Sequence, residues 1–377
     1  MSTLVYEGVR VLDFTEMQHG PVAAQALGDW GAEVIKIERP SGAGMRKIPT
    51  LSRNKKSLAL DLKKPEGKQI VYDLAKTADV VISNFRPGVM ERLGLGYDDL
   101  SRINPGIIVA YGSGYGQSGP DRDELGQDMM AQARAALVRG DPPRGAPCAF
   151  VDQFGGMMLA MGVMLALAAR EKTGRGQVVD SCLLNVAVFA DTVAATNLLN
   201  READAPKKDP RRKNPLYMAY KSADDRWVYI IGTFRDKALQ RAFRALEIPQ
   251  EVQGQFPEGR MKTTEDTLKA YDILAEAVSR LPADEVVKRV KAQDMMSVKV
   301  ATPEEVFQDP QVLHNKMIEE IELPSGKTVK TIGFPVKLSD TPARVRIPPP
   351  ELGRDNETIL KEVLGMDDDG IRELYEM

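Results

Sequence analysis

Strand-like and helix-like stretches alternate along the first 111 residues, and this alternation limits the possible fold more than any other feature. Short apolar runs rich in β-branched residues, typical of buried strands, occur at 9–14, 33–38, 79–83 and 107–111. Residues 21–30 and 65–77 lie between such runs and have helical spacing of apolar residues. The pattern predicts an α/β fold with a parallel sheet covered by helices on both faces.

Composition excludes several kinds of protein. The chain has 377 residues, enough for two domains, and its 51 basic and 54 acidic residues leave a net charge of −3. Since no basic excess points to a polyanion, nucleic acid is not an expected partner. Two cysteines and two histidines provide neither a disulfide framework nor a zinc site, so we expect no bound metal.

The N-terminal sequence and the longest apolar run indicate where in the cell we expect the protein. The start, MSTLVYEGVRVLDF, lacks the pattern of a secretory signal, and we expect a cytoplasmic protein. The run from Gly155 to Ala169 is shorter than the roughly 20 residues that a membrane span needs, so no membrane is expected. Its apolar residues do not form a single stripe, which predicts a helix over 153–169 that is buried nearly all round.

Changes in composition predict the domain boundaries. Residues 1–200 form the N-terminal part of a large domain, and the charged, proline-containing segment 201–215 is a linker. Residues 216–302 form a smaller α+β domain, with a strand at 227–232 and helices in 236–246 and 264–292. Residues 303–330 are a second linker. Residues 331–377 return to the large domain and end in an amphipathic helix from about Asn356.

A dinucleotide site is one interpretation of the first strand–turn–helix unit. Glu38, at the end of the second strand, has the position of an acidic residue that binds a ribose. The turn reads TEMQHG, however, with one glycine where the dinucleotide fingerprint has three. The sequence therefore favours a Rossmann-like unit that binds no dinucleotide.

Several motifs, taken in order, resemble one family. They are DFTEMQHGPVAAQALGDWGAEVIKIERP, SRNKKSLALDLKKPEGK, DVVISNFRPGVMERLGLGYDDL, NPGIIVAYGSGYGQSGP, FVDQFGG, KTGRGQ, GFPVKLSDTPARV and ELGRDNETIL. This set resembles the class III coenzyme A transferases, which include formyl-CoA transferase, carnitine CoA-transferase and the α-methylacyl-CoA racemases. The resemblance implies a Rossmann-like large domain built from both chain ends, an inserted small domain and an interlocked homodimer. It also implies CoA thioesters as substrates, with no permanently bound cofactor.

Asp152 is the candidate catalytic residue. The resemblance implies that it attacks an acyl-CoA thioester to give a mixed anhydride, and a carboxylate needs no base to activate it. Gly155 and Gly156 would leave room for the thioester, and the amides of the following helix could stabilise an oxyanion. The alternative is that Asp152 only caps that helix.

The resemblance places further residues near CoA. In NFRPGVMERL it implies that Asn84, Phe85 and Arg92 contact the nucleotide, with Phe85 on the adenine and Arg92 at a phosphate. It implies that Arg39 lies near the same nucleotide and that Gln18 lies near the acyl group. The basic stretch 53–56 either approaches a CoA phosphate or forms a solvated loop.

Two departures from the family separate transfer from racemisation. In GQDMMAQA, Gln127 stands where racemases have a histidine, beside Asp128, and glutamine cannot shuttle a proton. We place Gln127 and Asp128 near the bound acyl-CoA. Arg235 stands near the position of a racemase glutamate. We therefore expect a CoA-transferase acting between carboxylic acids, with a racemase or a non-catalytic CoA-binding protein as alternatives.

Overall fold

A computed structural model describes residues 4–42, 49–201, 214–232, 237–257, 260–323 and 325–376. The chain divides into two compact units. One contains the described residues up to Asn200 together with those from His314 onward, and the other lies within Arg201–Leu313.

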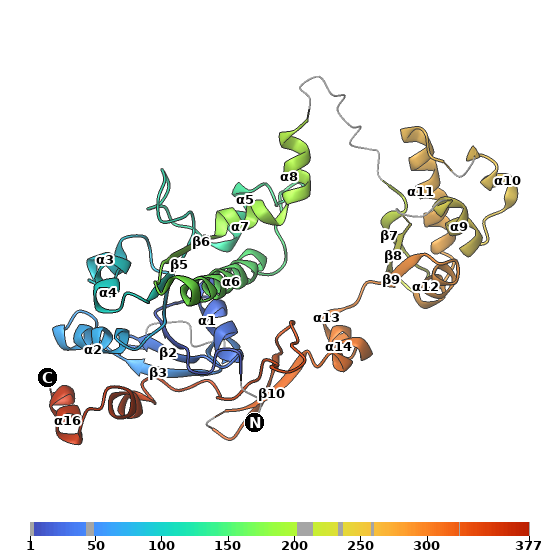
Figure 1. Ribbon diagram of the computed structural model, residues 1–377. Helices are drawn as coiled ribbons and strands as arrows, with labels where there is room; N and C mark the ends of the chain where they lie inside the picture. The colour runs from blue at the N-terminus through green and yellow to red at the C-terminus, as the bar shows by residue number, and fades with distance from the viewer. Residues whose placement is uncertain are drawn as a thin grey trace. The chain divides into compact units, whose positions relative to one another are not determined.

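A six-stranded parallel sheet forms the centre of the first unit (Figure 1), which confirms the predicted α/β class. Its strands are β1 (Arg10–Asp13), β2 (Glu33–Glu38), β3 (Lys55–Ala59), β4 (Val80–Ser83), β5 (Ile108–Ser113) and β6 (Val178–Cys182). The order is β3-β2-β1-β4-β5-β6. Successive strands are therefore added toward one edge from β1 to β3 and toward the other edge from β4 to β6. In such sheets ligands bind outside the carboxyl ends of the strands where this order reverses, here between β1 and β4.

Helices cover both faces of the sheet. Those of the first 200 residues are α1 (His19–Asp29), α2 (Pro65–Ala75), α3 (Val89–Arg92), α4 (Tyr97–Ile103), α5 (Asp128–Arg134), α6 (Phe150–Thr173), α7 (Leu183–Ala190) and α8 (Thr192–Leu199). On one face, α1 and α6 pack on alternate strand residues such as Val11 and Val34. On the other face, α2 and α4 pack on Leu12 and Ile35. The opposite directions of neighbouring strand side chains thus give two separate cores.

The structure contradicts both interpretations of the basic stretch 53–56, which leads into strand β3. Arg53 is 1% exposed and Lys55 is 0% exposed, so this stretch is neither a solvated loop nor a surface phosphate contact in this chain. Arg53 forms an ion pair with Asp29 at 2.6 Å, and Lys55 pairs with Asp13 at 2.7 Å. Buried charges persist where they are paired and hydrogen-bonded, which is the case for both.

The C-terminal residues complete the first unit along β3. The backbone of Asn54 bonds to the carbonyl of Ile347 at 2.9 Å, and the Asp355 amide bonds to the Ser57 carbonyl at 3.1 Å. The predicted single helix from Asn356 is divided, because the chain turns at Gly365, where φ is +68°. Its parts are α15 (Asn356–Thr358), a π-helical turn (Ile359–Val363) and α16 (Asp368–Glu376).

The segment 303–330 contains regular structure. It holds α13 (Pro303–Val306), α14 (Pro310–His314) and β10 (Ile318–Glu322), which pairs antiparallel with β11 (Thr328–Ile332). The side chain of Arg53 donates to the Ile332 carbonyl at 2.6 Å. This hairpin is therefore attached to the large unit.

The second unit is a small α+β body with its own core. Its antiparallel strands are β7 (Tyr217–Lys221), β8 (Trp227–Ile231) and β9 (Met296–Lys299), and its helices are α9 (Ala238–Ala245), α10 (Gln250–Gln253), α11 (Thr264–Val278) and α12 (Ala283–Ala292). Tyr220, Phe243 and Leu274 are among the side chains of its core. Most of the predicted linker 201–215 lies outside the described residues.

Helix α6 is the longest helix in the described part of the chain. It is also the one helix there that is long and apolar enough to cross a membrane, by length and composition alone. It packs on α1, β5 and β6, as a core helix of a globular protein does. The prediction that it is buried nearly all round is wrong for this chain alone, since Met161 is 47% and Leu165 63% exposed. One side of α6 is therefore not covered by other described residues of the first unit.

Candidate functional site

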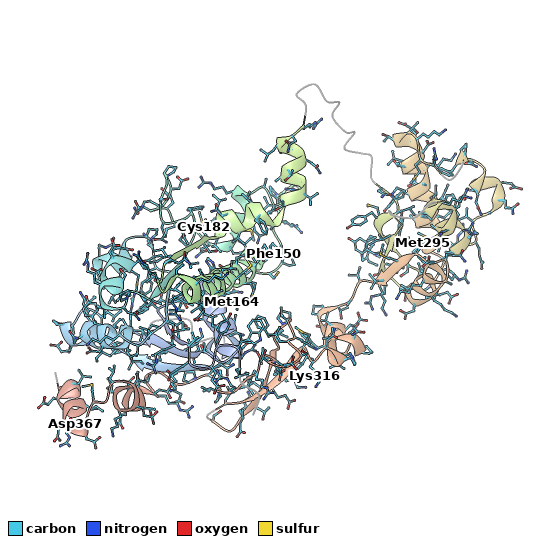
Figure 2. The ribbon with its side chains drawn as sticks, in the orientation of Figure 1. Phe150, Met164, Cys182, Met295, Lys316 and Asp367 are labelled. Atoms are coloured by element: carbon cyan, nitrogen blue, oxygen red, sulfur yellow. The ribbon has the colours of Figure 1, made fainter. Side chains whose placement is uncertain are left out.

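Asp152 lies in the first turn of α6, three residues after the N-cap residue Ala149. The alternative role as a helix cap is wrong, because the cap position belongs to Ala149 and Asp152 lies inside the first turn. The predicted start at residue 153 is also late, since α6 begins at Phe150. The Asp152 side chain is partly buried. Figure 2 labels Phe150, which marks this end of the helix.

The start of α5 supports the backbone of Asp152. The amide of Asp152 donates to Oδ2 of Asp128 at 2.9 Å. The other oxygen, Oδ1 of Asp128, accepts from the side-chain amide of Gln132. Oε1 of Gln132 in turn accepts from the Ala146 amide at 2.9 Å. Because Asp128 is 9% and Gln132 1% exposed, this chain of hydrogen bonds holds the first turn of α6 in a buried setting.

The surroundings of Asp152 make its carboxylate more basic. Burial, and to a smaller extent the negative charge of Asp128, together raise the pKa of Asp152 to about 6. The group is thus mostly ionised at neutral pH. A carboxylate with a raised pKa and little solvation is a better nucleophile than one on the surface, and such perturbed groups are typical of functional sites.

The two glycines after Asp152 serve helix packing. A Cβ on Gly156 would lie 2.5 Å from Cβ of Val22, and one on Gly155 would lie 3.1 Å from Nε2 of His19. The space beside Gly155 and Gly156 is therefore filled by α1, and it is not left open for a thioester as predicted.

The sequence interpretation did not identify His19 as a buried residue that contacts α6. Its side chain is 4% exposed, and Nε2 has no hydrogen-bond partner in the part of the chain that the structure describes. Burial lowers the pKa of His19 to about 4, although the nearby Gly155 backbone opposes this shift. The imidazole is consequently neutral at pH 7. The adjacent glycines in FVDQFGG are the signal that could have indicated a close contact with another helix.

Gln18 and Gln127 occupy equivalent places at two helix starts. Gln18 is the N-cap residue of α1 and Gln127 that of α5, and neither uses its side chain as a cap. Because the neighbouring His19 contacts Gly155, Gln18 lies close to the first turns of α6. Gln127 is exposed and adjoins Asp128. Gln127 thus adjoins in sequence the residue that accepts the Asp152 amide, and Gln18 adjoins in sequence the residue that contacts Gly155.

The predicted nucleotide contacts begin at the carboxyl edge of the sheet. Asn84 follows β4, and its side chain accepts from the Glu16 amide at 2.8 Å and donates to the Glu16 carbonyl at 2.7 Å. This side chain thus fixes the turn that carries Gln18. Phe85 is partly buried against the core on the α2 side of the sheet.

Two arginines converge on Gly88, where φ is +79°. A Cβ at this glycine would lie 3.0 Å from Nη1 of Arg92 and 3.6 Å from Nη2 of Arg122. Arg122 contacts Asp123 at 3.5 Å through Nε. Two guanidinium groups beside this partly buried glycine form a suitable place for a phosphate. Arg39, after β2, is exposed.

Two further expectations concern Arg235 and a bound metal. Arg235 lies outside the described residues. Among the residues that the structure does describe, no group of three or more metal-ligating side chains could hold a metal ion.

Comparison with known proteins gives consistent results. The model of CoA-transferase family III matches residues 6–356. The chain is 31% identical to succinyl-CoA:glutarate CoA-transferase of Homo sapiens, over 98% of this chain and 88% of that protein. It is 31% identical to the succinyl-CoA–L-malate CoA-transferase beta subunit of Chloroflexus aurantiacus, over 99% of this chain and 97% of the other. The crystal structure of Rv3272 from Mycobacterium tuberculosis superimposes with a TM-score of 0.81 at 32% identity, covering 94% of this chain and 99% of that one.

Proposed function

The chain belongs to CoA-transferase family III, and we propose that it moves coenzyme A between carboxylic acids through covalent intermediates on Asp152. The observation that carries this proposal is the carboxylate itself. It lies in the first turn of α6, caps no helix, and has a pKa raised to about 6 by burial and by Asp128.

The proposed reaction begins with attack on the donor. A carboxylate oxygen of Asp152 bonds to the thioester carbonyl carbon, the carbon–sulfur bond breaks, and CoA leaves as a thiolate. The thiolate then attacks the aspartyl carbonyl of the mixed anhydride, which releases the donor acid and leaves an aspartyl-CoA thioester. The acceptor carboxylate repeats these steps in reverse order and regenerates Asp152. No net proton transfer is needed, so the reaction requires no base to activate Asp152.

We assign the nucleotide end of CoA to a second group of residues. Arg92 and Arg122 over Gly88 would bind a phosphate, and Phe85 would contact the base. Gln18, in the turn that Asn84 holds through Glu16, would contact the acyl group.

The two relatives described above are named for succinyl-CoA with glutarate and with L-malate. Short carboxylic acids are therefore the first acceptors to test. An α-carbon racemisation would need a second proton-transferring group, and the exposed Gln127 does not supply one. Exchange of the α-proton in deuterium oxide should accordingly be absent.

Trapping the acyl-enzyme tests the mechanism. After mixing with an acyl-CoA donor, hydroxylamine should convert Asp152 to a hydroxamate, which mass spectrometry locates. Adduct formation should slow as the pH falls through about 6, because the protonated carboxyl group cannot attack. Asp152→Asn is the control and should bind CoA without forming the adduct. A hydroxamate on a different carboxylate would refute the assignment.

We also propose a homodimer. Large apolar side chains of α6, α7 and α8 are 47% to 85% exposed in the single chain: Met161, Leu165, Val188, Phe189, Leu198 and Leu199. We call these six residues the α6–α8 apolar set. Exposure of so many apolar side chains on successive helices is typical of a protein–protein interface, and a second copy is the proposed partner.

A further inference from the structure

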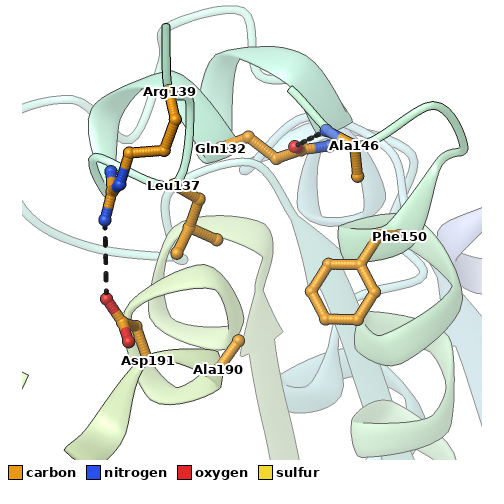
Figure 3. A pocket seen from close by; sticks show the side chains of 7 residues that line it. All are labelled: Gln132, Leu137, Arg139, Ala146, Phe150, Ala190 and Asp191. Carbon is orange, nitrogen blue, oxygen red and sulfur yellow. Dashed lines mark hydrogen bonds and ion pairs between the residues drawn. The ribbon is translucent and has the colours of Figure 1, made fainter. Parts of the chain in front are cut away.

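Gln132 is a buried polar side chain that joins three segments of the chain near Asp152. It is 1% exposed, and its Nε2 atom donates to Oδ1 of Asp128. Its Oε1 atom accepts from the Ala146 amide at 2.9 Å, a bond that Figure 3 shows between α5 and the loop before α6. Oδ2 of Asp128 accepts the Asp152 amide at 2.9 Å. Only Asp128 thus separates the Gln132 side chain from the backbone of the proposed nucleophile.

The two contacts of Gln132 fix the orientation of its amide group. Only the nitrogen end of a glutamine side chain can donate to a carboxylate, and only the oxygen end can accept from a backbone N–H. A flipped amide would therefore lose both hydrogen bonds. An apolar side chain of the same size would leave a carboxylate oxygen and a backbone N–H group buried without this partner, which is unfavourable.

The loop before α6 approaches Gln132 closely at a glycine. A Cβ at Gly145 would lie 2.8 Å from Oε1 of Gln132 and 2.6 Å from Sδ of Met129. A side chain at this position would push the loop away from α5, so its absence allows the next amide, that of Ala146, to reach Gln132. The loop is therefore attached to α5 at the same side chain that supports the proposed nucleophile.

Two carboxylates lie within this chain of hydrogen bonds. Burial and a neighbouring like charge favour the neutral form of a carboxyl group, whereas N–H donors favour its ionised form. Asp128 receives N–H donors at both oxygens, from Gln132 and from the Asp152 amide. Gln132 therefore helps to keep the negative charge on Asp128. Together with burial, which is the larger cause, that charge raises the pKa of Asp152 to about 6.

The other charged groups around Gln132 form ion pairs of their own. Arg139 and Asp191 line a pocket of about 300 Å³ that Gln132 also lines, and they lie 4.0 Å apart (Figure 3). Arg134, on α5 itself, pairs with Asp121. Helix α7, which packs on α5, has no ionisable side chain. These ion pairs include neither of the two carboxylates in the chain of hydrogen bonds.

We infer that Gln132 is a positioning residue for the proposed reaction: it holds the charged form of Asp128 against the Asp152 amide and attaches the loop before α6 to the same point. The inference rests on the proposed function, in which Asp152 attacks the donor thioester. Because its side chain is buried, Gln132 acts through Asp128 and does not touch the substrate. A role in stability alone would leave the pH dependence of the attack unchanged.

Gln132→Glu tests the inference through pH. A protonated carboxyl group has the shape of the amide and can also donate to Asp128 and accept from Ala146, whereas the ionised form cannot donate and repels Asp128. The rate of hydroxamate formation at Asp152 is divided by that of the unsubstituted protein at each pH, so that effects common to both proteins cancel. This ratio should fall by roughly tenfold or more between about pH 5.5 and 8.5.

Gln132→Met removes both hydrogen bonds at every pH. Because the turn that carries Asp152 would lose its support, hydroxamate formation should slow by roughly 10- to 100-fold throughout the same pH range. The affinity for CoA should stay unchanged in both variants, since Gln132 does not touch the substrate. Circular dichroism at each pH verifies that the variants are folded.

Gln69→Glu is the matched control. Gln69 also donates to an aspartate four residues away, Asp73, at 3.2 Å, but this pair lies exposed on α2, so its ratio should stay near one at every pH. A pH-independent ratio for Gln132→Glu, or an unchanged rate in Gln132→Met, would overturn the inference and leave the proposed function intact. If Gln132→Met does not fold, the ratio for Gln132→Glu is decisive by itself. Failure of the unsubstituted protein to form the hydroxamate would overturn the proposed function, and the inference with it.

Discussion

The buried imidazole of His19 should make the stability of the protein depend on pH. Its pKa is about 4 in the folded chain and near 6.5 when unfolded, so the unfolded state binds the proton first as the pH falls. The contribution of His19 is thus complete above about pH 6.5 and is lost between 6.5 and 4. From pH 7 to pH 5 the free energy of unfolding should fall by roughly 2 kcal/mol through this group alone.

His19→Asn isolates this contribution, because asparagine is polar and of similar shape but does not titrate. Urea unfolding at pH 7 and pH 5 should show a smaller decrease in the variant than in the unsubstituted protein. Equal decreases would mean that His19 is protonated in the folded state or is solvated. The sequence does not predict this behaviour, since burial of His19 depends on α6, about 130 residues away along the chain.

At the scale of single elements, helix α6 packs on α1 through Gly156. Alanine is the better helix former by about 1 kcal/mol. At Gly156, however, a Cβ would meet Val22 at 2.5 Å and the His19 carbonyl oxygen at 2.6 Å. Gly156→Ala should therefore lower the free energy of unfolding by roughly 1–3 kcal/mol, as overpacking does.

Gly155→Ala is the comparison for this prediction. Its closest contacts would be at 3.1 Å, to atoms of the His19 ring, so the loss should be smaller. Thermal or urea unfolding of the two variants gives the order. A Gly156→Ala variant at least as stable as the unsubstituted protein would show that α1 and α6 are not tightly packed.

The elements also show which parts of the fold the sequence can predict. Strands β1, β2, β4 and β5 are predictable because each contains buried apolar residues, many of them β-branched, within a short run. Strand β3 is not, because it begins with Lys55 and Lys56, and burial of Lys55 depends on Asp13 and the Pro21 carbonyl, which are distant in sequence. Asp152 can be selected from the resemblance to a family. Gln132 cannot, because its role follows from contacts with Asp128 and Ala146 that depend on tertiary structure.

The whole molecule should be a dimer that covers the α6–α8 apolar set. Leu165 is 63%, Phe189 61% and Leu199 85% exposed in the single chain. Such exposure is costly for a soluble monomer, whereas obligate dimers bury apolar interfaces of 2,000 Å² or more, a typical range. The resemblance also implies that the two chains interlock, in which case separation would require unfolding.

Sedimentation velocity at nanomolar concentration tests the assembly. The unsubstituted protein should remain a dimer on dilution, and Leu165→Glu should yield monomer or aggregate with loss of CoA transfer, because the charge would be placed in the interface. Val5→Glu provides a matched control, since Val5 is also apolar and 45% exposed but lies outside the α6–α8 apolar set. It should leave the dimer intact. A compact, soluble and fully active monomer would contradict the dimer, and it would show that the uncovered side of α6 is tolerated in water.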